Sequence, residues 1–138
     1  MNYSAAQQFS KIERFLYVVR IQKHLYLYQL KGVSRNTASS IEQHENYFVR
    51  TFFDYVRELD CLLCVNKCLC NDIKEFGEQL NRHRKQQNLS MYYIKNQYGI
   101  PFNQIVRIEK GRGYSKKILI RYLDVTQPEI SIIKPSKI

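Results

Sequence analysis

Hydrophobic residues recur along this chain at the three- and four-residue spacing of amphipathic helices, in two successive sets. In the second set, Asp72 and Glu75 form the capping box of a first helix, and a second helix over 90–98 ends at Gly99. A third helix follows, and Ser115 caps a fourth. The residues expected to face the core on the third and fourth helices are Ile100, Ile105, Ile108, Ile118, Leu119 and Leu123.

The first set has the same order of helices. Ser10 and Glu13 have the spacing of a capping box and are expected to open its first helix. The inward positions on its third and fourth helices are Val33, Ala38, Ile41, Val49, Phe52, Phe53 and Val56. Each set therefore predicts a small unit of four helices.

Two segments have the pattern of β-strands instead. Residues 61–70 are expected to form a hairpin that turns at Asn66-Lys67, and residues 129–134 alternate like a single C-terminal strand. A two-stranded hairpin alone is marginally stable, so these strands are expected to pair with each other or with those of a second chain. The second alternative predicts a homodimer through β-strands.

The two sets of helices are copies of one unit. Ile41-Glu42 recurs as Ile108-Glu109 at an offset of 67, whereas Leu16 and Arg20 recur as Leu80 and Arg84 at an offset of 64. The second copy therefore has three extra residues, between Lys95 and Gly99. The sequence predicts a mainly α-helical fold with short β-strands. Its expected parts are a first unit over 1–60, a hairpin linker over 61–71, a second unit over 72–125, and a strand and tail over 126–138.

The two copies differ in net charge. The 138 residues include 22 Lys+Arg and 12 Asp+Glu, a net charge of +10, and the pI is about 9.5. Residues 1–60 contribute +2 of this charge and residues 61–138 contribute +8. An excess of this size makes nucleic acid the first partner to consider, mainly for the second copy.

Several classes of protein are disfavoured. The longest purely apolar run, Phe15–Val19, is too short to span a membrane, and the polar start does not resemble a secretory signal, so we expect a cytoplasmic protein. No nucleophile elbow, phosphate-binding glycine loop or paired-carboxylate motif is present. We therefore expect neither enzymatic activity nor a cofactor.

Residues 88–111, with the sequence NLSMYYIKNQYGIPFNQIVRIEKG, resemble the lambda-repressor-like (XRE) helix-turn-helix family of DNA-binding proteins. The first copy has the same pattern in GVSRNT at 32–37 and in Ile41-Glu42, in degenerate form. The resemblance implies two tandem helix-turn-helix units. It also implies that an Arg of the first helix pairs with the Glu that ends the third. These structural ion pairs would be Arg84 with Glu109 and Arg20 with Glu42.

In this family the third helix enters the major groove, and its N-terminal residues contact base edges. The corresponding residues are Phe102, Asn103, Gln104 and Arg107 in the second copy and Arg35, Asn36, Thr37 and Ser40 in the first. Asn and Gln can pair with adenine and Arg with guanine, while a Thr methyl or a Phe ring can contact the thymine methyl. The alternative is that both helix faces are merely solvated.

Phosphate contacts are expected from the start of the second helix and from the loop after the third. The residues concerned are Ser90, Lys110, Arg112, Tyr114, Lys116 and Lys117. Cations, a Tyr hydroxyl and flexible glycines before a helix N-terminus suit phosphate binding. The first copy departs from this pattern, because Gln43 and Glu45 replace Lys110 and Arg112. Its second helix also lacks three residues, nearly one turn, and is expected to be shorter or differently angled.

The cysteines Cys61, Cys64, Cys68 and Cys70 invite a zinc hypothesis, since four thiolates can hold zinc. Strand geometry opposes it, because a turn at Asn66-Lys67 does not bring all four to one face. We therefore expect these cysteines to act as small buried hydrophobic residues, and we expect no metal site.

Together these observations predict a sequence-specific double-stranded DNA-binding protein, a transcriptional regulator. One chain could serve as a covalent pseudo-dimer on two half-sites. The alternative is a protein-interaction module that retains the fold and binds DNA weakly. The degenerate first copy favours this alternative, and the charge of the second copy opposes it.

Overall fold

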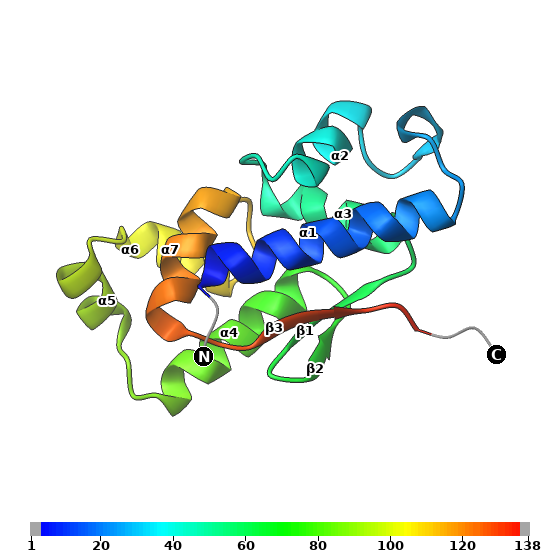
Figure 1. The fold of residues 1–138 in the computed structure, drawn as a ribbon. Coiled ribbons are helices and arrows are strands. Elements are labelled where there is room, and N and C mark those ends of the chain that lie inside the picture. Colours follow the sequence, from blue (N-terminus) through cyan, green and yellow to red (C-terminus); the bar gives the residue numbers. More distant parts are fainter. Residues whose placement is uncertain (1–3, 136–138) are drawn as a thin grey trace.

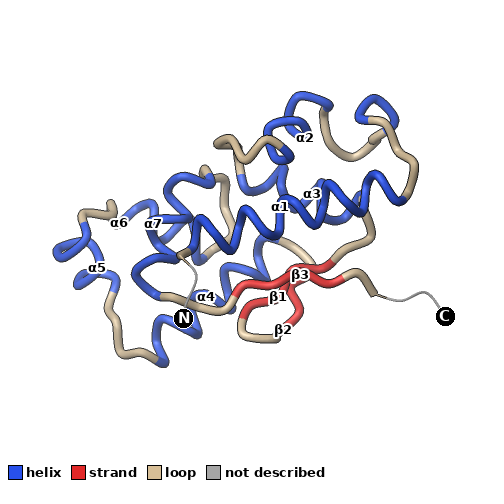
Figure 2. Tube along the Cα trace, in the orientation of Figure 1, coloured by secondary structure: helices blue, strands red, loops and turns tan. Residues whose placement is uncertain are grey.

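The computed structural model describes residues 4–135, which form a mainly helical protein with a small antiparallel sheet (Figures 1 and 2). Within that range there are seven α-helices, one 3-10 turn and three strands. In chain order they are α1 (Ala5–Gln22), η1 (Leu27–Gln29), α2 (Arg35–Glu42), α3 (Val49–Glu58), β1 (Leu62–Val65), β2 (Cys68–Cys70), α4 (Ile73–Gln86), α5 (Met91–Tyr98), α6 (Phe102–Glu109), α7 (Lys116–Thr126) and β3 (Ile130–Ile133).

Three of the seven helices in the described range begin at predicted caps. Asp72, Ser90 and Ser115 each accept a hydrogen bond from the backbone N–H three residues ahead. The prediction that Ser10 opens the first helix was wrong. The helix begins at Ala5, because Ser4 forms a capping box with Gln7 and the residues between Ser4 and Ser10 favour a helix.

The three extra residues of the second copy decide the form of its second helix. There, α5 forms two turns and ends at Gly99 in the left-handed conformation, with φ +70°. At the corresponding position the first copy has only the single 3-10 turn η1. The expected shortening of the second helix in the first copy is therefore confirmed.

All three strands belong to one sheet, in the order β2-β1-β3. The hairpin turns at Asn66 and Lys67, both with positive φ, and Val65 pairs with Cys68 as the turn position predicts. On its other side β1 pairs with β3 of the same chain. The C-terminal strand was expected to pair either with the hairpin of its own chain or with strands of a second chain, and in the structure it pairs with the hairpin of its own chain.

Equivalent residues of the two copies meet each other at two places. An antiparallel bridge joins Phe48 to Ser115, and Cys64 faces Ser131 across the β1–β3 ladder. Each pair is separated by the repeat offset of 67 residues. An antiparallel pair of equivalent residues is what a two-fold rotation produces, so an approximate two-fold axis passes through both pairs.

Backbone hydrogen bonds around the Phe48–Ser115 bridge have the same symmetry. Val49 N donates to Tyr114 O at 2.9 Å, and the equivalent Lys116 N donates to Tyr47 O at 2.8 Å. The helices follow it too, because α1 packs against α7 while the equivalent α4 packs against α3. Each copy thus lays its first helix against the fourth helix of the other.

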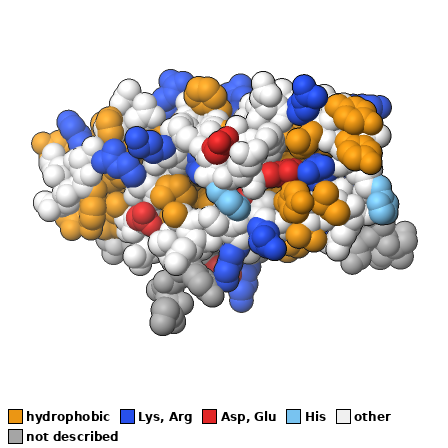
Figure 3. Space-filling model, turned by 45° about the horizontal axis from the view of Figure 1, so that its top comes forward, with side chains coloured by type: hydrophobic (Ala, Val, Ile, Leu, Met, Phe, Trp, Pro, Cys, Tyr) orange, Lys and Arg blue, Asp and Glu red, His pale blue; other side chains and the backbone are white. Residues whose placement is uncertain are grey.

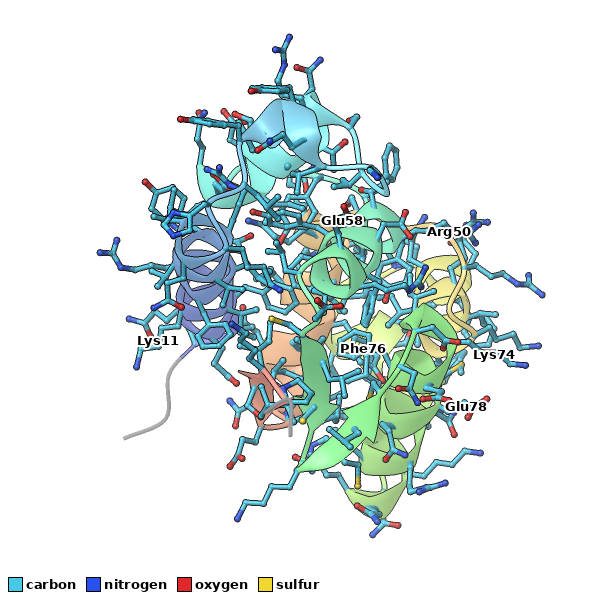
Figure 4. All side chains as sticks on the ribbon, turned by 90° about the vertical axis from the view of Figure 1, so that its right-hand side faces the viewer. Lys11, Arg50, Glu58, Lys74, Phe76 and Glu78 are labelled. Carbon is cyan, nitrogen blue, oxygen red and sulfur yellow. The ribbon has the colours of Figure 1, made fainter. Side chains whose placement is uncertain are left out.

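Both copies contribute to one hydrophobic core within the described residues. The expected inward residues are buried, except Ile118, which is half-buried because it lies near the exposed start of α7. Phe76 of α4 lies near the centre of the molecule, where its ring contacts Phe53 of α3 at a centroid distance of 5.3 Å (Figure 4). The copies therefore share their core across the pseudo-two-fold axis.

Candidate nucleic-acid interface

The ends of α2 and α6 are each tied to the helix that opens their copy. Arg84 donates from Nε and Nη2 to both carboxylate oxygens of Glu109, at 2.6 and 2.9 Å. The equivalent Arg20 and Glu42 make the same pair, at 2.6 and 2.8 Å. Both expected ion pairs are present in bidentate form, which orients each third helix relative to its first.

A tyrosine completes each of these pairs, a contact that sequence reasoning missed. Tyr122 OH donates to Glu109 at 2.6 Å, and the equivalent Tyr55 OH donates to Glu42. Burial alone would raise the pKa of Glu109, but hydrogen bonds from Arg84, Tyr122 and Asn81 outweigh it and hold that pKa below its ordinary value. Glu109 is therefore held as a carboxylate.

The two candidate base-reading helices lie on opposite sides of the pseudo-two-fold axis (Figure 1). There, α2 is at the upper right and α6 at the left, and the loops that follow them meet between them. The sheet lies below, at the other end of the axis. The rotation that relates the copies therefore also relates these two helices.

On α6, the candidate residues lie on the outer face of the helix. Phe102, Asn103 and Arg107 are exposed and Gln104 is half-buried, while Ile105 on the opposite face is completely buried. Arg107 Nε donates to Gly113 O at 2.8 Å, which holds the guanidinium against the following loop. The candidate side chains are thus together on one accessible surface.

On α2, the corresponding surface is less accessible. Arg35 and Asn36 are exposed, whereas Thr37 and Ser40 are half-buried. Thr37 Oγ1 also accepts a hydrogen bond from the capping Ser34 at 2.9 Å. The structure therefore leaves two exposed candidates on this helix, compared with three on α6.

The expected phosphate ligands divide into two groups. Ser90, Lys110, Arg112 and Lys117 are exposed, and Ser90 also caps α5. Lys74 adds a cation that the sequence did not indicate. Its Cα lies 2.5 Å from where a Cβ on Gly111 would be, so the start of α4 touches the loop after α6. A basic surface thus surrounds this loop.

Tyr114 and Lys116 do not belong to that surface, and their assignment as phosphate ligands was wrong. Tyr114 is 3% exposed and its hydroxyl is enclosed without a hydrogen-bond partner. Lys116 Nζ donates to Glu13 Oε2 at 2.9 Å and lies over the ring of Tyr47. Both side chains turn inward because they lie where the two copies meet.

Glu13 is the centre of a buried polar cluster at this junction. Its carboxylate accepts from Tyr47 OH at 2.5 Å and from Lys116, and it contacts His44 Nδ1 at 2.7 Å. A sequence signal for it exists, because Glu13 lies between Ile12 and Leu16 on the apolar face of α1. The cluster joins α1 of one copy to α7 of the other.

The second copy has no equivalent cluster, because Gly77 occupies the position of Glu13. A Cβ on Gly77 would lie 2.6 Å from the backbone oxygens of Ile108 and Glu109. The glycine thus lets α4 approach α6 closely. In the first copy, Tyr47 donates a hydrogen bond to the Glu13 carboxylate. Gly77 offers no such carboxylate in the second copy, so the hydroxyl of the equivalent Tyr114 has no hydrogen-bond partner.

Basic side chains are spread over the surface. Figure 3, which brings the top of the molecule forward, shows Lys and Arg side chains among hydrophobic ones, with fewer acidic residues. Arg50 and Lys74 extend from the side of the molecule opposite Lys11 (Figure 4). Arg50 is the first-copy equivalent of Lys117, so both copies carry a cation just inside the start of the fourth helix.

Exposed tyrosines occupy the second-helix region of both copies, which sequence reasoning did not anticipate. Tyr26 and Tyr28 stack at a centroid distance of 5.6 Å in the first copy, and Tyr92, Tyr93 and Tyr98 are exposed on α5 in the second. Tyr28 and Tyr92 are equivalent residues. Exposed aromatic side chains that are grouped in this way are typical of interaction sites.

The cysteines are placed differently from one another. Cys61, Cys64 and Cys70 are buried as expected, and burial raises the pKa of Cys70 to about 12. Cys68 is exposed, contrary to the expectation, because it follows the hairpin turn at the open end of the sheet. Within residues 4–135, no group of three or more His, Cys, Asp or Glu side chains is placed to hold a metal ion.

No protein-family model, curated protein or solved structure matches this chain. None of the helices within the described range is both long and apolar enough to cross a membrane.

Proposed function

We propose that this protein binds double-stranded DNA in a sequence-specific manner, as a transcriptional regulator built from two tandem helix-turn-helix units. The observation that carries the proposal is the placement of α2 and α6 on opposite sides of the pseudo-two-fold axis. Asn36 and Asn103, equivalent residues near the starts of these helices, are both exposed. Asn is suited to bidentate pairing with adenine in the major groove.

The symmetry of the junction supports two half-sites in inverted orientation, although the copies follow one another as a direct repeat in the sequence. B-DNA has two-fold symmetry between its strands, so protein elements related by a two-fold rotation address inverted half-sites. The half-sites would differ, because Arg35 and Ser40 stand where α6 has Phe102 and Arg107. One chain would occupy one such site.

The second unit would supply most of the affinity. Lys110, Arg112, Lys117 and Lys74 surround its basic loop, and the half of the chain that contains it carries +8 of the net charge. Phosphate contacts provide most of the electrostatic free energy of DNA binding and carry no direct sequence information.

A protein-interaction module is the second candidate. It is favoured by the exposed tyrosines, by the single turn η1 in place of a second helix, and by the capture of Lys116 by Glu13. In this case the basic surface would bind DNA only non-specifically.

Selection of DNA from a random duplex library by the purified full chain tests the proposal. Affinity for the selected duplex is then measured against salt concentration for the wild type, Asn103→Ala, Lys117→Ala and Lys67→Ala. We expect Asn103→Ala to relax base preference at one position. Lys117→Ala should weaken binding to all sequences and reduce the salt slope by about 0.9, the value for one phosphate contact.

Lys67→Ala is the matched control, because Lys67 is exposed at the hairpin, far from α6 along the pseudo-two-fold axis. It should leave both base preference and salt slope unchanged. Binding no tighter than about 10⁻⁶ M to every duplex would contradict the proposal and favour the interaction module. Specific binding to half-sites in direct orientation would retain the DNA-binding function but exclude the inverted arrangement.

A further inference from the structure

The pseudo-two-fold symmetry is broken at the sheet. On one side of the β1–β3 pair, β2 extends the sheet, but within the described residues no strand pairs with the outer edge of β3. A groove of about 540 Å³ lies beside that edge, between β3, the start of α1 and the end of α7. The two edges are equivalent by symmetry but differ in what covers them.

The backbone orientation of β3 follows from its pairing with β1. Asn66 N donates to Glu129 O at 2.8 Å, so the backbone groups of Glu129 point toward β1. Orientation alternates along an antiparallel strand, so the N–H and C=O groups of Ile130 and Ile132 point away from β1. A side chain of α1 already meets one of these groups, because Ile130 N donates to Gln8 Oε1 at 3.0 Å.

The equivalent residues of β1 show what this edge can bind. Leu63 and Val65 are the counterparts of Ile130 and Ile132, and their backbone groups also point away from the β1–β3 ladder. There they pair with Cys70 and Cys68 of β2. The three residues of β2 therefore occupy, beside β1, the position that is symmetry-equivalent to the groove beside β3.

The lining of the groove sets the chemistry of its occupant. Phe15 of α1 and Ile132 of β3, which are both half-buried, provide apolar contact surface. Asp124 and Glu129 are exposed carboxylates at the end near α7, and Lys11 lies further along α1. An extended chain with apolar side chains at alternate positions and a Lys or Arg at the α7 end matches this arrangement.

We propose that the outer edge of β3 and this groove bind an extended peptide segment of a partner protein, which adds a fourth strand to the sheet. The segment pairs with the outward backbone groups of Ile132. Its alternate apolar side chains lie against Phe15 and Ile132, and its basic residue lies against Asp124 and Glu129. This site is separate from α2 and α6 and does not depend on DNA binding.

The probe is a display library of octapeptides, selected on the full chain. We expect selected peptides to have alternate apolar residues and one terminal Lys or Arg. Bound peptide should slow hydrogen exchange at the amide of Ile132. Each selected peptide is then synthesised again with N-methyl groups on alternate backbone amides, in both registers, and one register should weaken binding at least about tenfold by removing hydrogen bonds.

Two proline variants of the chain provide a matched test and control for peptide binding. Ile132→Pro removes an N–H that points outward from β3, and Leu69→Pro removes one that points outward from β2, so neither deletes a bond to β1. Ile132→Pro should lose peptide binding at least about tenfold, while Leu69→Pro should retain it.

Several results would overturn the proposal. The first is the selection of peptides that lack the alternating pattern. The second is equal affinity of Ile132→Pro and the wild type for the selected peptides. The third is that bound peptide does not slow hydrogen exchange at the amide of Ile132. Equal affinity for N-methylated and unmodified peptides in both registers would also exclude strand addition in a chain that folds normally. Light scattering provides the last test: a dimer that Ile132→Pro converts to monomer would make the occupant a second copy of this chain.

Discussion

Lys116 Nζ lies 2.9 Å from Glu13 Oε2, across the seam where α7 of the second copy packs on α1 of the first. The Glu13 side chain is completely buried and that of Lys116 is 13% exposed. The lysine therefore stabilises the junction between the copies, although it stands in a loop-to-helix segment whose composition suits phosphate binding.

Replacement of this lysine tests its role. Lys116→Met should lower the free energy of unfolding by about 3 kcal/mol, because it leaves a buried carboxylate with one charged partner fewer. Chemical denaturation measures this loss, and a double-mutant cycle with Glu13→Gln isolates the pair. The salt dependence of DNA binding should not change.

Its neighbour Lys117 is the control. Lys117→Met should change stability by no more than about 0.5 kcal/mol, because this side chain is exposed. If Lys116→Met were as stable as Lys117→Met, the contact with Glu13 would contribute nothing to the fold.

The repeat gives a second matched pair in Tyr114 and Tyr47. Tyr114→Phe should be neutral or stabilise the protein by about 1 kcal/mol, because it removes a buried hydroxyl without a partner. Tyr47→Phe should destabilise by about 1–3 kcal/mol, because it removes a hydrogen bond to the buried Glu13. Thermal unfolding of both variants checks the difference, and similar losses would contradict it.

Gly77 allows close contact between α4 and α6. Gly77→Ala should destabilise by about 1–3 kcal/mol even though alanine favours a helix, since the new methyl group would meet two backbone oxygens at 2.6 Å. Urea denaturation measures the change, and Gly32→Ala is the comparison because the group nearest its Cβ is the Glu58 side-chain carboxylate, which can move. Greater stability of Gly77→Ala would contradict the packing argument.

Acid should weaken the fold through Glu109. The pKa of this carboxyl is lower in the folded protein than in the unfolded chain, where the ordinary value is about 4.3. Its contribution is present above that pH and is lost as the pH falls toward the folded-state pKa. Glu109→Gln should therefore be less stable at pH 7 and lose less stability between pH 5 and pH 3. Denaturation at each pH provides the measurement, and parallel curves would contradict it.

Thiol labelling should distinguish the four cysteines. Cys68 is exposed and should react first with a thiol reagent in the native protein. Cys70 should react only on unfolding, because it is buried and its pKa is about 12. Peptide mass spectrometry after timed labelling gives the order, and equal rates would contradict the buried position of Cys70.

Local signals in the sequence were sufficient for most helices and the hairpin turn, while the two Arg–Glu pairs were expected from the family resemblance. Caps such as Ser90 and Ser115 act through hydrogen bonds to residues three positions ahead, so they can be recognised without tertiary information. The repeat extended this reasoning from one copy to the other. Ser10 was misassigned because two serines with suitable spacing lie near the start of one helix, and the earlier one caps it.

The orientation of the copies could not be read from the sequence. Two copies in tandem are compatible with a direct or an inverted arrangement, and the pairing of Phe48 with Ser115 and of Cys64 with Ser131 selects the inverted one. Such pairings join residues 67 positions apart, and nothing in the local pattern specifies them.

The sequence by itself determined the helices, the repeat and the uneven charge, because periodicity, caps and composition are properties of neighbouring residues. Only the tertiary structure decided which polar residues remain available to a ligand. Tyr114 is buried and Lys116 is paired with Glu13 because the copies meet at their positions, whereas Lys117 and Asn103 stay exposed. Burial depends on contacts between distant segments, which a linear pattern of residue types does not specify.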